Sequence, residues 1–302
     1  MSPRLLPLLA LLHACAAATS EPPAADASTR VDAADAGPAV DVAPQQDAVT
    51  ADVPPPPVDR PPPPDGACLP NRDGVITRAE FPSAVGASAL YLVNRDGVTV
   101  EGVNTEGAVV EGTRRWDFSA RRSDDQPVLD EVLSPRGQWW SGLYADATFA
   151  AVLDRGTNLL GVYRLGPDAL ELLATVSTAA NQTNLRFDPP VAVLRFPLRV
   201  GARWEQSVNG SGTVNFTPLV NVTRYVTTVD AAGEVWTPAA RFPSLRVNTT
   251  LDQSIPLTVF RRTLRTYAFV TECGGLVARV ASVENDTSEN FTRASEYRRL
   301  NL

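Results

Sequence analysis

The sequence contains no lysine, and its single histidine and single methionine, His13 and Met1, both lie near the N-terminus. The rest of the chain therefore excludes Ser-His-Asp and Cys-His catalysis, Schiff-base chemistry and histidine-ligated zinc. Carboxylates, hydroxyls, arginines and cysteines remain, and no pair of carboxylates is marked by a motif. The sequence predicts a protein that is not an enzyme, with a carboxylate-based glycan-active enzyme as the catalytic alternative.

The apolar run at the N-terminus is too short to cross a membrane as a helix. It covers Leu5–Leu12 and follows one arginine, whereas a spanning helix needs about 20 apolar residues. This layout is typical of a secretory signal peptide. The string LHAC, which ends at Cys15, resembles a bacterial lipobox and implies cleavage before Cys15 and acylation of that residue. The alternative is ordinary signal-peptide cleavage at a small-x-small site such as Ala14-Cys15-Ala16.

Acyl chains such as palmitate on Cys15 would anchor the protein, because each buried CH₂ group contributes about 0.8 kcal/mol. Ala16, the next residue, resembles the outer-membrane sorting signal of enteric bacteria. We therefore expect an outer-membrane lipoprotein of the cell envelope, facing either the periplasm or the exterior. The membrane is its expected partner, through the lipid anchor.

Residues 16–67 lack aromatic side chains and contain 12 prolines, with nine acidic residues against two arginines. Such a segment cannot bury enough apolar surface to offset the entropy of ordering it, so we expect a disordered linker. The predicted organisation is a signal peptide at 1–14, a lipidated cysteine and linker at 15–67, and one domain at 68–302. Acids and arginines nearly balance in that domain, which gives no electrostatic case for nucleic acid.

The domain is predicted to be all-β, mainly antiparallel, as a curved half-barrel or a sandwich. Short runs rich in valine, leucine, threonine and aromatic residues alternate with Gly, Asp, Asn and Pro. Short helices are expected at Thr77–Phe81 and near Asp125–Val132. The expected strands are Ala89–Val93, Val98–Val103, Arg114–Ser119, Trp139–Ala145, Phe149–Leu153, Leu159–Leu165, Ala169–Thr178, Val191–Phe196, Thr213–Phe216, Val220–Val229, Leu245–Leu251, Leu257–Thr266, Leu276–Val283 and Arg293–Leu300.

The pentapeptide NRDGV occurs twice, at 71–75 and at 94–98. In the second copy, Asp96-Gly97 lies between two alternating apolar runs, which favours a hairpin turn over Asn94–Gly97. The first copy resembles the second half of an EF-hand loop at 69–80, with Gly74 as its sixth residue. Its oxygen donors, as a candidate calcium site, would be Asn71, Asp73, the Val75 carbonyl, Thr77 and Glu80.

The first position of that loop is Leu69, which supplies no oxygen where an aspartate belongs. Any calcium binding is therefore expected to be weak, and no other cofactor is expected. The alternative is an Asx turn over Asn71–Gly74 that leads into a short helix ended by Pro82.

Cys68 and Cys273 are the cysteines that remain after Cys15. A secretory signal places them in an oxidising compartment, so we predict a disulfide between them; two free buried thiols are the alternative. Trp139 and Trp140 would point to opposite faces of a strand. One of them is therefore a candidate exposed aromatic for stacking on a sugar or a lipid, against simple packing in the core.

Three segments in the C-terminal half carry a resemblance: LRFPLRVGARW, GEVWTPAARFPSLRV and YAFVTECGGLVARVAS. They resemble a recurrent pattern, FPLxVGxxW, TPAxxF and GLV, of uncharacterised secreted β-domain proteins and lipoproteins from GC-rich Gram-negative bacteria. The resemblance covers roughly residues 191–283, and the chain departs from it at Glu272-Cys273. It implies an open antiparallel half-barrel, similar to lipoprotein carriers, without an assigned activity.

Three functions follow as hypotheses. The leading one is a non-catalytic outer-membrane lipoprotein that displays its β domain for binding or for envelope structure. The second is a carrier of lipid or another apolar ligand, which requires an unfilled apolar concave face. The third is the glycan-active enzyme, which requires two acids about 5–10 Å apart in a cleft.

Overall fold

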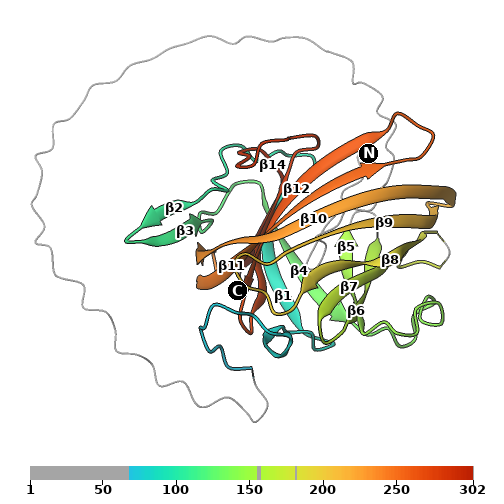
Figure 1. The fold of residues 1–302 in the computed structure, drawn as a ribbon, viewed down its shortest axis with the longest axis horizontal. Helices are drawn as coiled ribbons and strands as arrows, with labels where there is room; N and C mark the ends of the chain where they lie inside the picture. The colour runs from blue at the N-terminus through green and yellow to red at the C-terminus, as the bar shows by residue number, and fades with distance from the viewer. Residues whose placement is uncertain (1–67, 155–157, 181, 302) are drawn as a thin grey trace, which may run out of the picture. The chain divides into compact units, whose positions relative to one another are not determined.

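The computed structural model describes residues 68–301, apart from 155–157 and 181, and within them the regular secondary structure is almost entirely β-strand (Figure 1). A single 3-10 turn, η1 (Arg78–Glu80), comes first. The strands are β1 (Ser88–Asn94), β2 (Ala108–Val110), β3 (Thr113–Asp117), β4 (Asp125–Leu133), β5 (Phe149–Asp154), β6 (Leu159–Leu165), β7 (Ala169–Ser177), β8 (Asn184–Arg195), β9 (Arg203–Val214), β10 (Thr217–Trp236), β11 (Arg241–Ser254), β12 (Arg261–Thr271), β13 (Gly275–Ser282) and β14 (Ala294–Asn301). The predicted antiparallel all-β class is confirmed.

The curved sheet closes on itself. Its strand order is β11-β12-β13-β14-β1-β4-β5-β6-β7-β8-β9-β10, and β10 also pairs with β11. Twelve strands therefore form a closed antiparallel barrel, which goes further than the expected half-barrel. β3 adds in parallel to the end of β10 at Glu234–Trp236 and carries β2 as a short hairpin, which projects away from the barrel in Figure 1.

Closure depends on the length and twist of β10. This strand has 20 residues; it pairs with β9 over Thr217–Thr228 and with β11 from Val222 to Trp236. A bulge in the pairing with β11 lies between Val229 and Ala231. A bulge increases the local twist of a strand and bends it, which lets one long strand join both ends of the sheet.

The barrel interior is filled by apolar side chains. One continuous core cluster draws buried residues from strands around the ring, and such residues can meet only on the concave side of a closed sheet. Phe149 and Tyr163 stack there with ring centroids 5.2 Å apart. Other members include Leu172, Phe187, Trp204, Tyr225, Val247 and Leu264, all 5% exposed or less.

Two further clusters pack on the outside of the barrel. Tyr267 and Phe269 point outward from β12, and Phe269 contacts Trp116 and Phe118 edge-on at 5.0 and 5.4 Å between centroids. Gly233 on β10 allows β3 to approach, since a Cβ there would lie 2.2 Å from the Arg114 carbonyl oxygen. The third cluster covers the outside of β5–β7 and includes Trp140 and Tyr144.

Three predicted elements do not form, and a fourth, the strand at Thr213–Phe216, is instead the end of β9 and the turn that leads into β10. Asp125–Val132 is not a helix, because it pairs along the whole of β1 as strand β4. Val98–Val103 forms no hairpin with β1, because β14 and β4 occupy both edges of that strand; only Val100 makes a bridge, to Ala294. Trp139–Ala145 is a series of turns instead of a strand.

The turn predicted at Asn94–Gly97 nevertheless forms, one residue later, over Arg95–Val98, with Gly97 at φ +69° and the Val98 amide donating to the Arg95 carbonyl at 3.1 Å. The buried Asn94 amide group donates to the Val98 and Ser295 carbonyls and accepts the Tyr297 amide. This asparagine therefore ties the turn to β14.

Candidate functional site

The disulfide predicted between Cys68 and Cys273 is present, with the two Cα atoms 5.5 Å apart. It joins the first described residue of the domain to the turn between β12 and β13. Two backbone contacts reinforce it: the Cys273 amide donates to the Glu80 carbonyl at 2.8 Å, and the Arg72 amide donates to the Glu272 carboxylate at 2.7 Å. The N-terminal segment is thus fixed to one end of the barrel.

The EF-hand-like loop forms an Asx turn. The Asp73 amide donates to the Asn71 side-chain oxygen at 2.9 Å, and the Val75 amide donates to the Asp73 carboxylate at 2.8 Å. The Asn71 side-chain nitrogen donates to the other Asp73 oxygen at 3.1 Å. Gly74 supplies the turn with φ +78°. The Asn71 and Asp73 oxygens assigned to calcium are therefore engaged by the loop itself.

The remaining acidic position of that loop caps the 3-10 turn. Glu80 accepts the Thr77 amide at 2.9 Å and the Thr77 hydroxyl at 2.8 Å, which is a capping box. Leu69, at the missing ligand position, is 66% exposed. Among the residues that the structure describes, no three His, Cys, Asp or Glu side chains are grouped so as to hold a metal ion.

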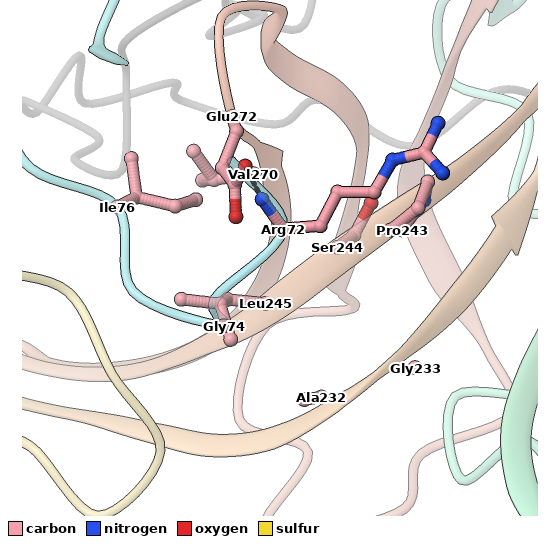
Figure 2. Close-up of a pocket in the computed structure, with 10 residues that line it drawn as sticks. All are labelled: Arg72, Gly74, Ile76, Ala232, Gly233, Pro243, Ser244, Leu245, Val270 and Glu272. Atoms are coloured by element: carbon pink, nitrogen blue, oxygen red, sulfur yellow. Dashed lines mark hydrogen bonds between the residues drawn. The ribbon is translucent and has the colours of Figure 1, made fainter. Parts of the chain in front are cut away.

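One small pocket lies where the N-terminal segment meets the ends of β11 and β12 (Figure 2). Its volume is about 120 Å³, below the roughly 300 Å³ at which ligand pockets begin. Glu272 lies near the Arg72 backbone, and the Arg72 guanidinium extends away from it toward Pro243 and Ser244. The lining is otherwise apolar or backbone: Gly74, Ile76, Ala232, Gly233, Leu245 and Val270. Such a pocket suits water or a very small ligand.

A second pocket of about 120 Å³ brings two carboxylates to one place, Asp146 and Asp188, with Arg164 and Arg186. Arg164 forms an ion pair with Asp146 and another, at 2.7 Å, with Glu171. Both aspartates are exposed to solvent, so neither lies in the desolvated environment that a catalytic acid of a glycosidase needs. This arrangement is a surface ion-pair network without the features of a hydrolytic site.

The candidate exposed aromatics, Trp139 and Trp140, are not free to stack on a ligand. Trp140 is fully buried in the cluster over β5–β7. Trp139 is half-buried, and its indole N–H donates to the Ser177 carbonyl at 2.9 Å. Because the segment turns instead of forming a strand, the two rings do not alternate between faces, and both serve packing.

The most unusual feature of the interior is a group of four buried charges. Glu296 accepts from Arg298 Nε at 2.9 Å and from Arg279, and Arg298 also pairs with Asp130. All four side chains are 3% exposed or less. Arg279 lies opposite Ala268, a member of the interior core, so the group is inside the barrel. Its charges cancel, which suits structural pairing better than binding of an ion.

Burial shifts the pKa of Arg279 and of two tyrosines beside this group. Desolvation raises the pKa of Tyr163 and Tyr91 well above the ordinary value, although the nearby Arg279 and Arg298 oppose the shift. Desolvation also lowers the pKa of Arg279 while Glu296 opposes it. The Tyr91 hydroxyl donates to the Leu276 carbonyl at 2.7 Å. These shifts mark a dry interior.

Sequence reasoning missed this charged group. The available signal was arginine and glutamate inside otherwise apolar strands, in LVARVAS and SEYRRLN. Period-two alternation places Arg279 on one face of its strand. Only the pairing of β12, β13 and β14 shows that this face is the barrel interior. Asp130 comes from β4, distant in sequence, so its partnership with Arg298 was not readable.

The predicted signal peptide, the acylation site Cys15 and the linker lie outside the described residues. Within the described part of the chain, no helix is long and apolar enough to cross a membrane.

Comparison with known proteins gives little further. No family model matches the chain, and no curated protein matches it. Among solved structures, a candidate lipoprotein from Parabacteroides distasonis is similar, with 12% sequence identity and a TM-score of 0.36 over 74% of this chain and 97% of that one. A likeness at this level carries no inference about function.

Proposed function

We propose that this chain is a non-catalytic, lipid-anchored protein of the cell envelope that displays a closed β barrel from the outer membrane for binding or for envelope structure. The observation that carries the proposal is the Cys68–Cys273 disulfide. Structural disulfides persist in oxidising compartments outside the cytosol, where a chain with a secretory signal and a lipobox-like LHAC string is expected.

The filled interior disfavours the apolar carrier. That hypothesis needs an open concave face of leucine, valine and phenylalanine, and in the described residues this face is occupied by the main core cluster. Copurification of a bound lipid, seen by native mass spectrometry, would reopen it.

Acylation of Cys15 is tested directly by Cys15→Ser. The variant should no longer incorporate radiolabelled palmitate and should leave the membrane fraction or accumulate unprocessed. The matched control is Cys68→Ser/Cys273→Ser, which removes the two disulfide-bonded cysteines and should retain both label and membrane association. Normal label and fractionation of Cys15→Ser would refute the anchor.

A further inference from the structure

Two neighbouring hairpins present apolar side chains to solvent at one end of the barrel. We call them the apolar tips: residues 215–220, which form the turn after β9 and the first residues of β10, and residues 255–260, between β11 and β12. Leu257 and Val259 are 106% and 100% exposed, as free as in an extended chain. Phe216, Val220 and Phe260 are also exposed.

The two tips lie at the same end of the sheet. β10 and β11 pair from Val222 and Ser254 onward, so both tips begin where that pairing stops. Figure 1 shows both hairpins reaching outward on the same side. The apolar side chains of the two tips can therefore meet one surface together.

The tips are free of charge. No Asp, Glu or Arg occurs in residues 206–223 or 253–260. The first charges behind them are Glu205, Arg224, Asp252 and the exposed Arg261; Arg224 pairs with Glu205 at 2.8 Å and lies 3.8 Å from Asp252. An uncharged end followed by a charged band matches the change from hydrocarbon to interface across the surface of a bilayer.

The shape and the charge of this end select a lipid surface over a protein groove. Fully exposed, convex side chains are enclosed most readily by a fluid phase. The acidic turn that includes Glu284 and Asp286 is set back beside Thr263, to which the Asn285 amide donates at 2.8 Å. The tips themselves carry no charge, so zwitterionic lipid should suffice for their insertion.

The tether permits such a contact. Cys68 is bonded to the turn after β12, whereas the tips precede β12. The 11 residues of β12 separate these ends by about 36 Å. The 52 residues between Cys15 and Cys68 have a contour length of about 170–190 Å. A chain anchored at Cys15 can thus turn its tips toward the same bilayer.

We propose that the apolar tips insert into the surface of a lipid bilayer, with the side chains of Leu257 and Val259 entering first. The proposed anchor at Cys15 would hold the tips near a bilayer, which favours lipid over a protein as their partner. The test therefore uses an unacylated full chain carrying Cys15→Ser, so that failure of the anchor and failure of the tips give different results.

Tryptophan at the tip reports insertion. Leu257→Trp, in the unacylated chain, should shift its emission to the blue on addition of phosphatidylcholine vesicles and should be quenched by brominated lipid. Val109→Trp on β2 is the matched control, because Val109 is 65% exposed and lies beside the other end of β10. Equal responses of the two variants, or no response at the tip, would overturn the proposal.

Removing the apolar groups tests the energetics. Leu257→Ser/Val259→Ser should reduce flotation with vesicles at least about tenfold, because each large aliphatic side chain contributes that much or more to partitioning. Both side chains are fully exposed, so the fold and the disulfide should be unchanged. Added phosphatidylglycerol or salt should change binding little. If the wild type instead self-associates without binding vesicles, and this variant is monomeric, the tips are a contact between copies and the proposal is wrong.

Discussion

Replacing both cysteines of the disulfide, as Cys68→Ser/Cys273→Ser, should lower the free energy of unfolding by about 2–5 kcal/mol. The bridge closes a loop of 205 residues, for which restriction of the unfolded chain gives an upper value of about 5 kcal/mol. The folded state should lose little, because the Ile76–Leu198 backbone pair, at 2.8 and 2.9 Å, still holds the N-terminal segment. The effect therefore lies mainly in the unfolded state.

Reversible denaturant unfolding followed by tryptophan fluorescence measures this loss, in a Cys15→Ser background that removes the third thiol. At about 2–4 °C per kcal/mol for a domain of this size, the melting temperature should fall by about 4–20 °C. The slope against denaturant should rise, since the unfolded variant is less compact. Wild-type protein with reductant should reproduce the variant. An unchanged midpoint, or two free thiols in protein isolated from an oxidising compartment, would refute the reasoning.

Three further outcomes are expected. Arg298→Ala should destabilise the fold by about 3–5 kcal/mol because it removes the arginine paired with the buried Asp130 and one of the two arginines paired with the buried Glu296. Arg224→Ala, in an exposed pair, should have a marginal effect, and equal losses would contradict the role of burial. Burial raises the pKa of Tyr297 from 10.0 to about 12. The stability that its neutral form provides is therefore complete below pH 10 and is lost as the pH rises toward 12. Phenolate absorbance of the folded protein at pH 10 that matches the unfolded chain would contradict this. Calorimetry should detect no micromolar calcium binding by the wild type, and Leu69→Asp should raise its affinity if the loop can adopt EF-hand geometry; no change in that variant would identify the loop as a turn alone.

Several properties were readable from the sequence because they depend on composition or on neighbouring residues. The missing histidines and lysines limited the chemistry, and two cysteines in the domain left one intramolecular pairing, which the structure contains. Alternation and turn residues predicted the all-β class and several strands closely, such as Leu159–Leu165. The Asx turn at Asn71–Gly74 was also among the stated alternatives, since its hydrogen bonds span only two residues.

Tertiary structure decided which strands pair. The hairpin expected after Asn94 fails because β14, from the far end of the chain, occupies the edge of β1 that it needed. Barrel closure between β10 and β11, the pairing of Arg298 with Asp130 and the joint placement of the apolar tips have the same origin. A strand's alternation is local, whereas its partner and register are set by which long-range pairing buries the most apolar surface while leaving no buried charge unpaired.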